Sequence, residues 1–382
     1  MICLIQTGGI RIKLSCCLSK AVAAVCLAAL LCSCGAALPG GSGSSGGSFP
    51  SWPGSSSGDT SDTGPGQEPS GEDVSLPDDL STVGLNVTRH TQSEIIRYIK
   101  SSSASFSDPV EFAEPSSISS QIPGRLSQET KDSALAILNQ FRFIAGLNYN
   151  VTWDDSLDRF QQAACLVNAM NGNISHTPDR PAGISDELYD DACSGAGTSN
   201  LGAGYQTLNW SLLGYMADVD VSSLGHRRWC LAPSMKVVSM GAVPNSRTQY
   251  RNFYSMYAFG SASGRSNTTV AWPAQVTPIE YFNNPSQSFD NGAFWSLSLG
   301  RTVNKDSVRV IVQQKNGRTW EFSSETSGIN FAVDNGNYGQ TGCIMFRPNV
   351  VCRAGDEFLV TVILKGEPAA IQYTVSFFQL SN

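Results

Sequence analysis

Two of the three histidines in this chain carry the chemistry that its sequence suggests. His176 and His226 can each supply a ring nitrogen to a divalent metal such as zinc. Asp218 can supply a third ligand and leave one position open for water, as in hydrolytic zinc sites. His176 can equally bond a backbone carbonyl in a loop, and His226 can cap or pack at a helix start. The residue types alone therefore leave a metal site and a structural role both open.

Helical patterns surround these residues. Ser127 is suited to cap a helix over 128–145, whose apolar residues recur at helical spacing until Gly146. Asp154 is suited to cap a second helix that Gly172 ends. Further helices are expected over 93–101, 208–217 and 226–231, and strands between 236 and 271. Helices that flank a small sheet predict an α+β fold.

Five short segments then follow one another in an order that resembles a known family. They are 138–147, 150–157, Ile174-Ser175-His176-Thr177-Pro178, Ser199-Asn200-Leu201, and Gly225-His226-Arg227-Arg228-Trp229 with Leu231 and Pro233. This order resembles the CAP superfamily (cysteine-rich secretory, antigen 5, pathogenesis-related 1) in its bacterial SCP-like form, over about residues 125–260. The resemblance implies an α-β-α sandwich whose central cleft holds two histidines and two acids, and some members bind a divalent metal there.

Carried onto this chain, the resemblance places His176 and His226 in the cleft, together with Asn200. Ser199 stands where the family has its first acid, and Asp218 is preferred over Asp220 for the second. The loss of one carboxylate removes a negative charge that would favour a cation, and also a possible general base. Ser199 therefore favours ligand binding over catalysis.

The residues around His226 allow two interpretations. The aromatic side chains at positions 210, 215 and 229 either line a ligand groove or follow the helix faces into the core. Arg227 and Arg228 either bind an anion or pair with an acid of the sandwich.

The first 33 residues have the pattern of a signal peptide. Arg11, Lys13 and Lys20 precede a short apolar run over 21–31, which is typical of a secretory signal. The run ends near Cys34, in a context that resembles a bacterial lipobox, so Cys34 is the expected lipidation site. Residues 34–80 are rich in Gly, Ser and Pro and predict a disordered tether.

The segment after the CAP-like part reads as a separate β module. Residues 81–272 are expected to form the CAP/SCP-like domain with an N-terminal helical extension, and 273–382 an immunoglobulin-like β-sandwich. About seven short strands are expected from 294 onward, with a hairpin turn at Asn316-Gly317. The residues of this module suggest a spacer or an adhesive domain rather than a catalytic one.

Five cysteines follow Cys34, and an extracytoplasmic location permits disulfides. Cys343 and Cys352 are close in sequence and form one candidate pair, and Cys193 with Cys230 forms another. Cys165 lies in an apolar helical pattern and is expected to be a buried thiol.

The distribution of charge and the expected location limit the classes of function that this chain can have. Outside seven acids in the tether, the chain has 25 acids and 25 bases, with no basic stripe, which argues against nucleic acid as a partner. We expect a secreted, membrane-anchored cell-surface protein of the bacterial lipoprotein type, held by its N-terminal lipid. Its function is expected to be binding of an envelope or extracellular ligand, either glycan, lipid or protein, through the histidine cleft. The alternative is a metal-assisted extracytoplasmic hydrolase that resembles a peptidase.

Overall fold

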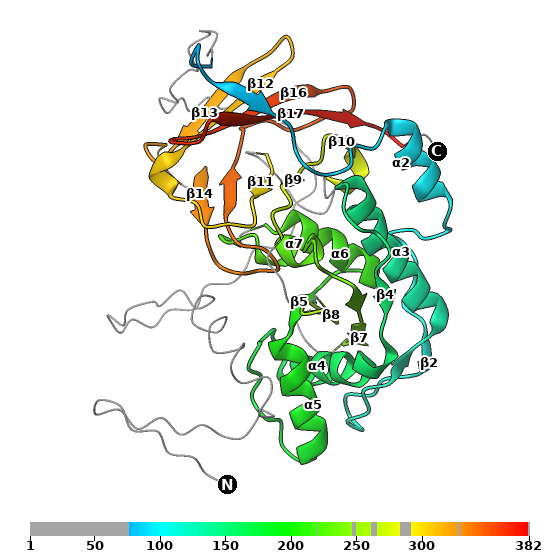
Figure 1. Ribbon diagram of the computed structural model, residues 1–382. Helices are drawn as coiled ribbons and strands as arrows, with labels where there is room; N and C mark the ends of the chain where they lie inside the picture. Colours follow the sequence, from blue (N-terminus) through cyan, green and yellow to red (C-terminus); the bar gives the residue numbers. More distant parts are fainter. Residues whose placement is uncertain are drawn as a thin grey trace, which may run out of the picture.

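The computed structural model describes residues 76–380 apart from 220, 247–249, 261–265, 283–291, 327 and 329. The described chain mixes helices with several β-sheets, which confirms the α+β class (Figure 1). The expected signal peptide, Cys34 and most of the expected tether lie outside the described residues, as does Asp220. Within the described part, no helix combines the length and apolar character needed to cross a bilayer.

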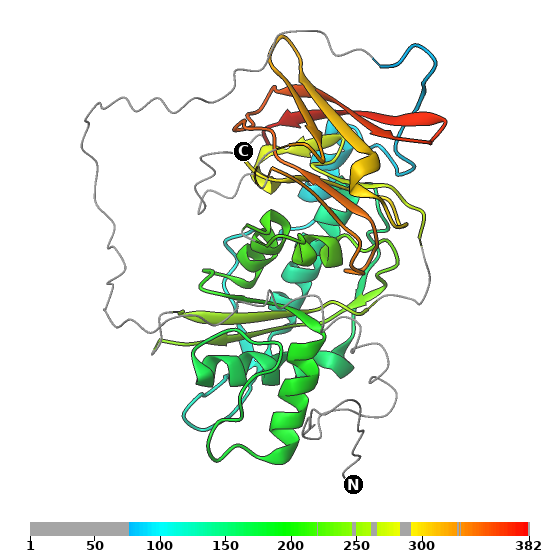
Figure 2. The same ribbon diagram turned by 90° about the vertical axis from the view of Figure 1, so that its left-hand side faces the viewer.

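A three-stranded antiparallel sheet lies between two layers of helices (Figure 2). Its strands run in the order β5 (Ser199–Ala203), β8 (Asn252–Tyr257) and β7 (Met240–Pro244). One face is covered by helices α4 (Asp158–Asn171) and α5 (Asp186–Gly197). The opposite layer consists of α6 (Leu208–Ala217), α7 (Gly225–Cys230) and α3 (Gln128–Ile144), which packs on α6.

The helices that the sequence predicts begin and end as their capping residues indicate. Ser127 accepts a hydrogen bond from the amide of Thr130 at the start of α3, and Gly146 follows its end with a φ of 71°. Asp154 caps the short 3₁₀ turn η1 (Asp155–Leu157) that leads into α4, and α4 ends at Gly172. The helices α6, α7 and α2 (Gln92–Lys100) also match their expected positions within a residue or two.

Helix α5 and strand β5 are not predicted from the sequence pattern. The helix begins at Ser185, whose hydroxyl accepts a bond from Leu188 N, and it buries only Ala192, Gly195 and Ala196. These small residues allow α5 to approach α4 closely, because a Cβ on Gly195 would lie 2.0 Å from the carbonyl oxygen of Phe160. A contact built from glycine and alanine leaves no periodic pattern of large apolar residues to detect.

Strand β5 separates its side chains between the two helical layers, as the period-two geometry of a strand requires. Ser199 bonds Gln161 of α4, and Leu201 packs with Ala164 and Ala196. Asn200, in contrast, bonds α7, through the carbonyl oxygen of His226. Neighbouring residues of β5 therefore serve opposite faces of the sheet.

A two-sheet β-sandwich follows the helical layers in sequence and lies against them (Figure 1). Trp295, Phe346, Phe358 and Phe377 meet in its interior. One sheet contains β13 (Thr319–Ser323), β12 (Val308–Gln314), β16 (Glu357–Leu364) and β17 (Ala369–Phe378), with β1 (Ser81–Val83) and β10 (Val276–Pro278) parallel to β17. The other contains β14 (Phe331–Asp334), β15 (Cys343–Phe346), β11 (Trp295–Ser298) and β9 (Val270–Trp272).

The sandwich contains strands from both sides of residue 273, where the sequence predicts the boundary between two domains. Strands β1 and β9 come from the segment that the sequence pattern assigns to the preceding domain. Phe141 of α3 packs edge-on against Trp272, with ring centroids 5.8 Å apart, and against Tyr281 at 5.1 Å. One continuous hydrophobic core therefore runs from the helices into the sandwich.

Short elements complete the described chain. The remaining pairs are β2 (Phe112–Glu114) with β3 (Arg125–Leu126), and β4 (Thr152–Trp153) in parallel with β6 (Val237–Val238). Two 3₁₀ turns, η2 (Ile279–Tyr281) and η3 (Lys305–Ser307), lie beside the sandwich strands.

Candidate functional site

Asp218 and His226 form a hydrogen-bonded pair at the junction of α6 and α7. The Nδ1 of His226 lies 2.7 Å from Oδ1 of Asp218. The other carboxylate oxygen, Oδ2, accepts a bond of 3.1 Å from the backbone amide of Arg227. The Asp218 side chain has no exposed surface, whereas that of His226 is 28% exposed. The preference for Asp218 as the acid beside His226 therefore agrees with this contact.

The two residues that flank the segment between α6 and α7, Asp218 and Leu224, have left-handed backbone conformations. Asp218 ends α6 with a φ of 50°, a left-handed conformation that aspartate tolerates. Leu224 precedes α7 with a φ of 49°, which is uncommon for a large residue. Strain of this kind persists only where surrounding contacts enforce it, and it is found most often at functional sites.

The pair with Asp218 fixes the tautomer of His226. A carboxylate can only accept here, so Nδ1 carries the proton and the neutral ring presents Nε2 as an acceptor. Burial opposes the charged imidazolium, but the hydrogen bond and the charge of Asp218 outweigh it and raise the pKa of His226 above its usual value. The ring stacks on Tyr215, with centroids 5.5 Å apart.

A backbone carbonyl, and not a carboxylate, holds the ring of His176. The residue belongs to the segment of chain that connects α4 to α5, and its Nδ1 is 2.7 Å from the carbonyl oxygen of Ala196. Because a carbonyl only accepts, Nδ1 again carries the proton and Nε2 is an acceptor. Desolvation lowers the pKa of His176, the bond to Ala196 opposes that change, and the charge of His226 lowers the pKa further.

Both histidines are tied to the same short stretch of chain, where α5 passes into β5. Ala196 accepts from His176, and the Nδ2 of Asn200 donates a bond of 3.0 Å to the carbonyl oxygen of His226. Three residues lie between these two anchors, Ala196 and Asn200. Hydrogen bonds thus join Asn200, Asp218 and His226, and His176 is tied to the same stretch of chain as Asn200; we refer to these four as the histidine site.

Ser199 does not share this arrangement. Its hydroxyl donates a bond of 2.9 Å to Oε1 of Gln161, and the residue is 5% exposed. The side chain lies in the α4 layer, on the opposite face of β5 from Asn200. Its inclusion in the predicted cleft is thus not matched by a contact with either histidine.

The predicted disulfides are absent from the described residues. Cys193, Cys230 and Cys343 are free thiols, so neither pairing is formed. Cys193 lies on α5 and Cys230 on α7, and the sheet stands between these helices. Burial raises the pKa of Cys230 and Cys343, which keeps both as thiols. Cys165 is a buried thiol, as predicted, and burial raises its pKa to about 12.

The donor set fits a three-ligand metal site poorly. Among the described residues, no group of three or more His, Cys, Asp or Glu side chains is placed to hold a metal ion. Both oxygens of Asp218 are engaged by His226 and Arg227, and Ser199 faces Gln161. Two histidine Nε2 atoms remain, which is fewer than the three protein ligands of a catalytic zinc site.

Tyr205 is a neighbour of the site that no sequence signal indicated. A Cβ on Gly214 would lie 2.2 Å from the Tyr205 hydroxyl oxygen, so glycine allows this ring to cross α6. Desolvation, and then the charge of Asp218, raise the pKa of Tyr205. Tyr215 and Trp210 pack against the core, as the core interpretation of these aromatic residues expected.

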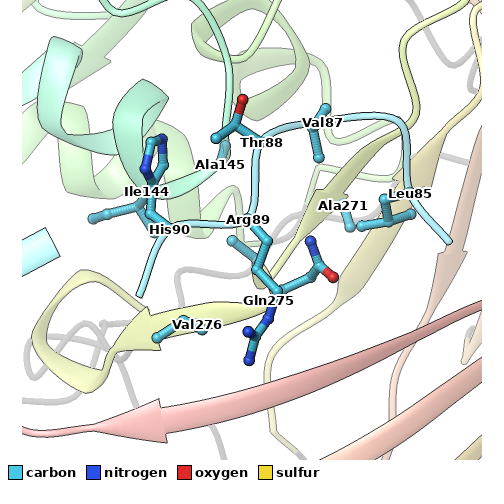
Figure 3. A pocket seen from close by; sticks show the side chains of 11 residues that line it. Leu85, Val87, Thr88, Arg89, His90, Ile144, Ala145, Ala271, Gln275 and Val276 are labelled. Atoms are coloured by element: carbon cyan, nitrogen blue, oxygen red, sulfur yellow. The ribbon is translucent and has the colours of Figure 1, made fainter. Parts of the chain in front are cut away.

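A pocket elsewhere on the molecule contains the third histidine (Figure 3). Residues 85–90, the end of α3 and residues from β9 to β10 line it, and both Arg89 and Gln275 are among the lining residues. The imidazole of His90 stacks on Phe143 with centroids 3.8 Å apart, and desolvation lowers its pKa. Because the ring is packed against the core, His90 is a suitable reference for the other two histidines.

The histidine site combines a buried carboxylate, an imidazole oriented by it, and a second imidazole whose Nε2 has no hydrogen-bond partner among the described residues. It can accept hydrogen bonds from a ligand, and His226 can take up a proton. Comparison with protein-family models, curated proteins and solved structures finds no match for this chain.

Proposed function

We propose that this chain is an extracytoplasmic, membrane-tethered member of the CAP superfamily that binds a hydroxyl-bearing envelope or extracellular ligand through its histidine site. Three observations support the family assignment: the order of the five sequence segments, the sheet between two helical layers, and the two histidines tied to one α5–β5 junction. On this proposal the helical layers are the CAP α-β-α sandwich, and the two-sheet module is immunoglobulin-like.

The observation that carries the binding role is the state of the two imidazoles. Both Nδ1 atoms donate to protein oxygens, so Nε2 is an acceptor on His176 and on the neutral form of His226. In the protonated form of His226, which its raised pKa favours, Nε2 is a donor instead. Hydroxyl groups of a glycan, or of a polar lipid headgroup, are the donors that such a pair recognises. The lowered pKa of His176 keeps its ring neutral at pH 7, which preserves this acceptor.

Binding can be tested with purified full-length protein and defined probes. We would measure the affinity for cell-wall glycan and for phospholipid vesicles, with wild type, His176→Ala and His226→Ala. Each substitution should weaken binding of the preferred probe by about tenfold, which corresponds to ~1.4 kcal/mol for one lost hydrogen bond. His90→Ala is the control and should bind as wild type. Equal affinity in all four proteins would contradict the proposal.

The alternative function is hydrolysis, and one observation favours it. A carboxylate that holds an imidazole in a fixed tautomer is the arrangement of a general base and its orienting partner. Metal content and peptide hydrolysis, with and without chelator, distinguish the two functions. Turnover that disappears in His226→Ala would support the hydrolase, and turnover that persists would place it elsewhere.

A further inference from the structure

The two residues that follow His226 connect its helix to the β-sandwich. Arg227 is 1% exposed, and its guanidinium donates to Met216 O at 2.7 Å and to Ala217 O at 3.0 Å. Its Nη1 also reaches Phe294 O at 2.9 Å, beside β11. One side chain therefore joins the end of α6, the start of α7 and the sandwich.

Arg228 makes a second set of contacts with the sandwich. Its Nη1 pairs with Oδ1 of Asp334 at 2.7 Å, and its Nη2 donates to the carbonyl oxygens of Gln340, at 2.8 Å, and Gly336. The ring of Tyr338 lies beside the same guanidinium, 4.8 Å from Cζ to the ring centroid. These partners belong to residues 334–340, at the end of β14 and in the loop that leads to β15. We refer to residues 334–340 as the clasp.

Glycines on both sides bring the clasp and α7 into direct contact. A Cβ on Gly225 would lie 2.9 Å from Cδ1 of Tyr338. Gly339 has a φ of 77°, and a Cβ there would lie 2.5 Å from Cβ of Ala232 and 3.1 Å from Cε3 of Trp229. A methyl group at position 339 would therefore force the clasp away from the helix.

Helix α7 depends on contacts of this kind. It has six residues and no side-chain cap at its N-terminus, and a helix this short has little intrinsic stability. The strained residue before it, Leu224, packs against Cys343 and Met345 of the sandwich. The direction in which α7 presents His226 is thus set by tertiary contacts. Asn200 of the sheet bonds His226, Phe294 beside β11 accepts from Arg227, and the clasp holds Arg228.

We propose that the clasp is a positioning element for the histidine site, in which Arg228 and Asp334 act through α7 to hold the His226 imidazole against Asp218. This role gives the β-sandwich a part in the site itself, beyond that of a spacer or adhesive module. The positioning role of the clasp requires no ligand or reaction, so it can be tested independently of the proposed function.

The substitution Gly339→Ala tests this role without a change of charge. The readout is the tautomer of His226 in the full-length protein, obtained from the ring ¹⁵N chemical shifts at a pH well above the pKa of that ring. Wild type should show the Nδ1–H form that Asp218 selects. When the clasp is displaced, the bond to Asp218 loosens, and the ring nitrogens should shift toward a mixture of both tautomers.

Gly366→Ala is the matched control. Gly366 also belongs to the sandwich and has a positive φ, of 92°, but no atom lies within 4 Å of a Cβ built there. Backbone strain is therefore shared by the two variants, and only Gly339→Ala disturbs α7. The control should lose stability without any change at His226, and the tautomer of His90 should be the same in all proteins.

Asp334→Asn gives a second measurement if Gly339→Ala does not fold. It weakens the ion pair of Arg228 and should shift the His226 tautomer in the same direction, with recovery in Asp334→Glu. A wild-type tautomer in a Gly339→Ala protein that is less stable than Gly366→Ala would overturn the proposal. Equal stability of the two glycine variants would also overturn it, because the clasp contact would then be unimportant.

Discussion

The imidazole of His226 is 28% exposed, and the carboxylate of Asp218 that holds it at 2.7 Å is completely buried. Solvent can thus reach part of the imidazole but none of the carboxylate. The buried acid fixes the orientation of the partly exposed ring. No solvent water reaches the Asp218 carboxylate to compete for its hydrogen bond with His226.

Replacement of Asp218 by Asn should lower the pKa of His226. Without the charge of the carboxylate, burial of the ring becomes the dominant effect, so the pKa should fall from above its usual value of 6.5 to below it. Titration of the histidine Cε1 protons by NMR measures this change. The pKa of His90 is the internal control, and an unchanged value for His226 would contradict the assigned contact.

The same pair should make stability depend on pH. Because the folded-state pKa of His226 is raised, its contribution is fully present below about pH 6.5 and is lost as the pH rises through the folded-state pKa. The excess stability of wild type over His226→Gln should therefore be larger at pH 5.5 than at pH 8.5. Urea unfolding at the two pH values measures it, and a difference that grows with pH would have the wrong sign.

Replacement of Ser199 by Ala should lower stability but leave ligand binding intact. The variant loses the buried hydrogen bond to Gln161, at a cost of about 1 kcal/mol, on the face of β5 away from the histidine site. Ser194→Ala is a matched control, because its hydroxyl bonds a backbone oxygen on the exposed side of α5. Chemical unfolding and probe binding check both variants, and weakened binding in Ser199→Ala would place this residue in the site after all.

The helical layers and the β-sandwich should unfold together. Trp272 is 1% exposed and packs against Phe141 across the boundary between them, so Trp272→Ala should cost about 3–5 kcal/mol. Calorimetry should show one transition in wild type and one transition at lower temperature in the variant. Two separate transitions, of which only one responds to the substitution, would show that the two parts are independent.

Replacement of Cys34 by Ala should release the protein into the medium. The expectation follows from the lipobox-like sequence before Cys34, because a lipid anchor requires this thiol. Fractionation of cells that express wild type or the variant measures the membrane-bound share. A variant that remains with the membrane would exclude Cys34 as the anchor.

Local signals predicted the elements that have strong caps or large apolar residues. Ser127 and Gly146 delimit α3 as expected. The choice of Asp218 as an acid of the site came from the family resemblance, and the structure places it in contact with His226. Helix α5 was not predicted, because its buried residues are alanine and glycine and form no pattern of large apolar residues. All four residues of β11 are buried, the two serines included, and Ser296 accepts a hydrogen bond from Arg227 of α7.

Long-range partners could not be predicted from one sequence. Arg228 and Asp334 are 106 residues apart, and nothing in the local pattern around either residue indicates the other. The disulfide pairings failed for the same reason, since closeness in sequence for Cys343 and Cys352 does not determine where the fold places them. Such contacts depend on how the layers assemble, which a periodic pattern does not encode.

Strand β1 is the first strand of the described chain, and all three of its residues are exposed. Its parallel pairing with β17 is the first set of contacts that would bear load if an anchored amino terminus were pulled. With three residues in register, it would peel away before the neighbouring strands came under tension. Tension on the amino terminus would therefore act first on this short pairing and only afterwards on the longer antiparallel strands of the same sheet.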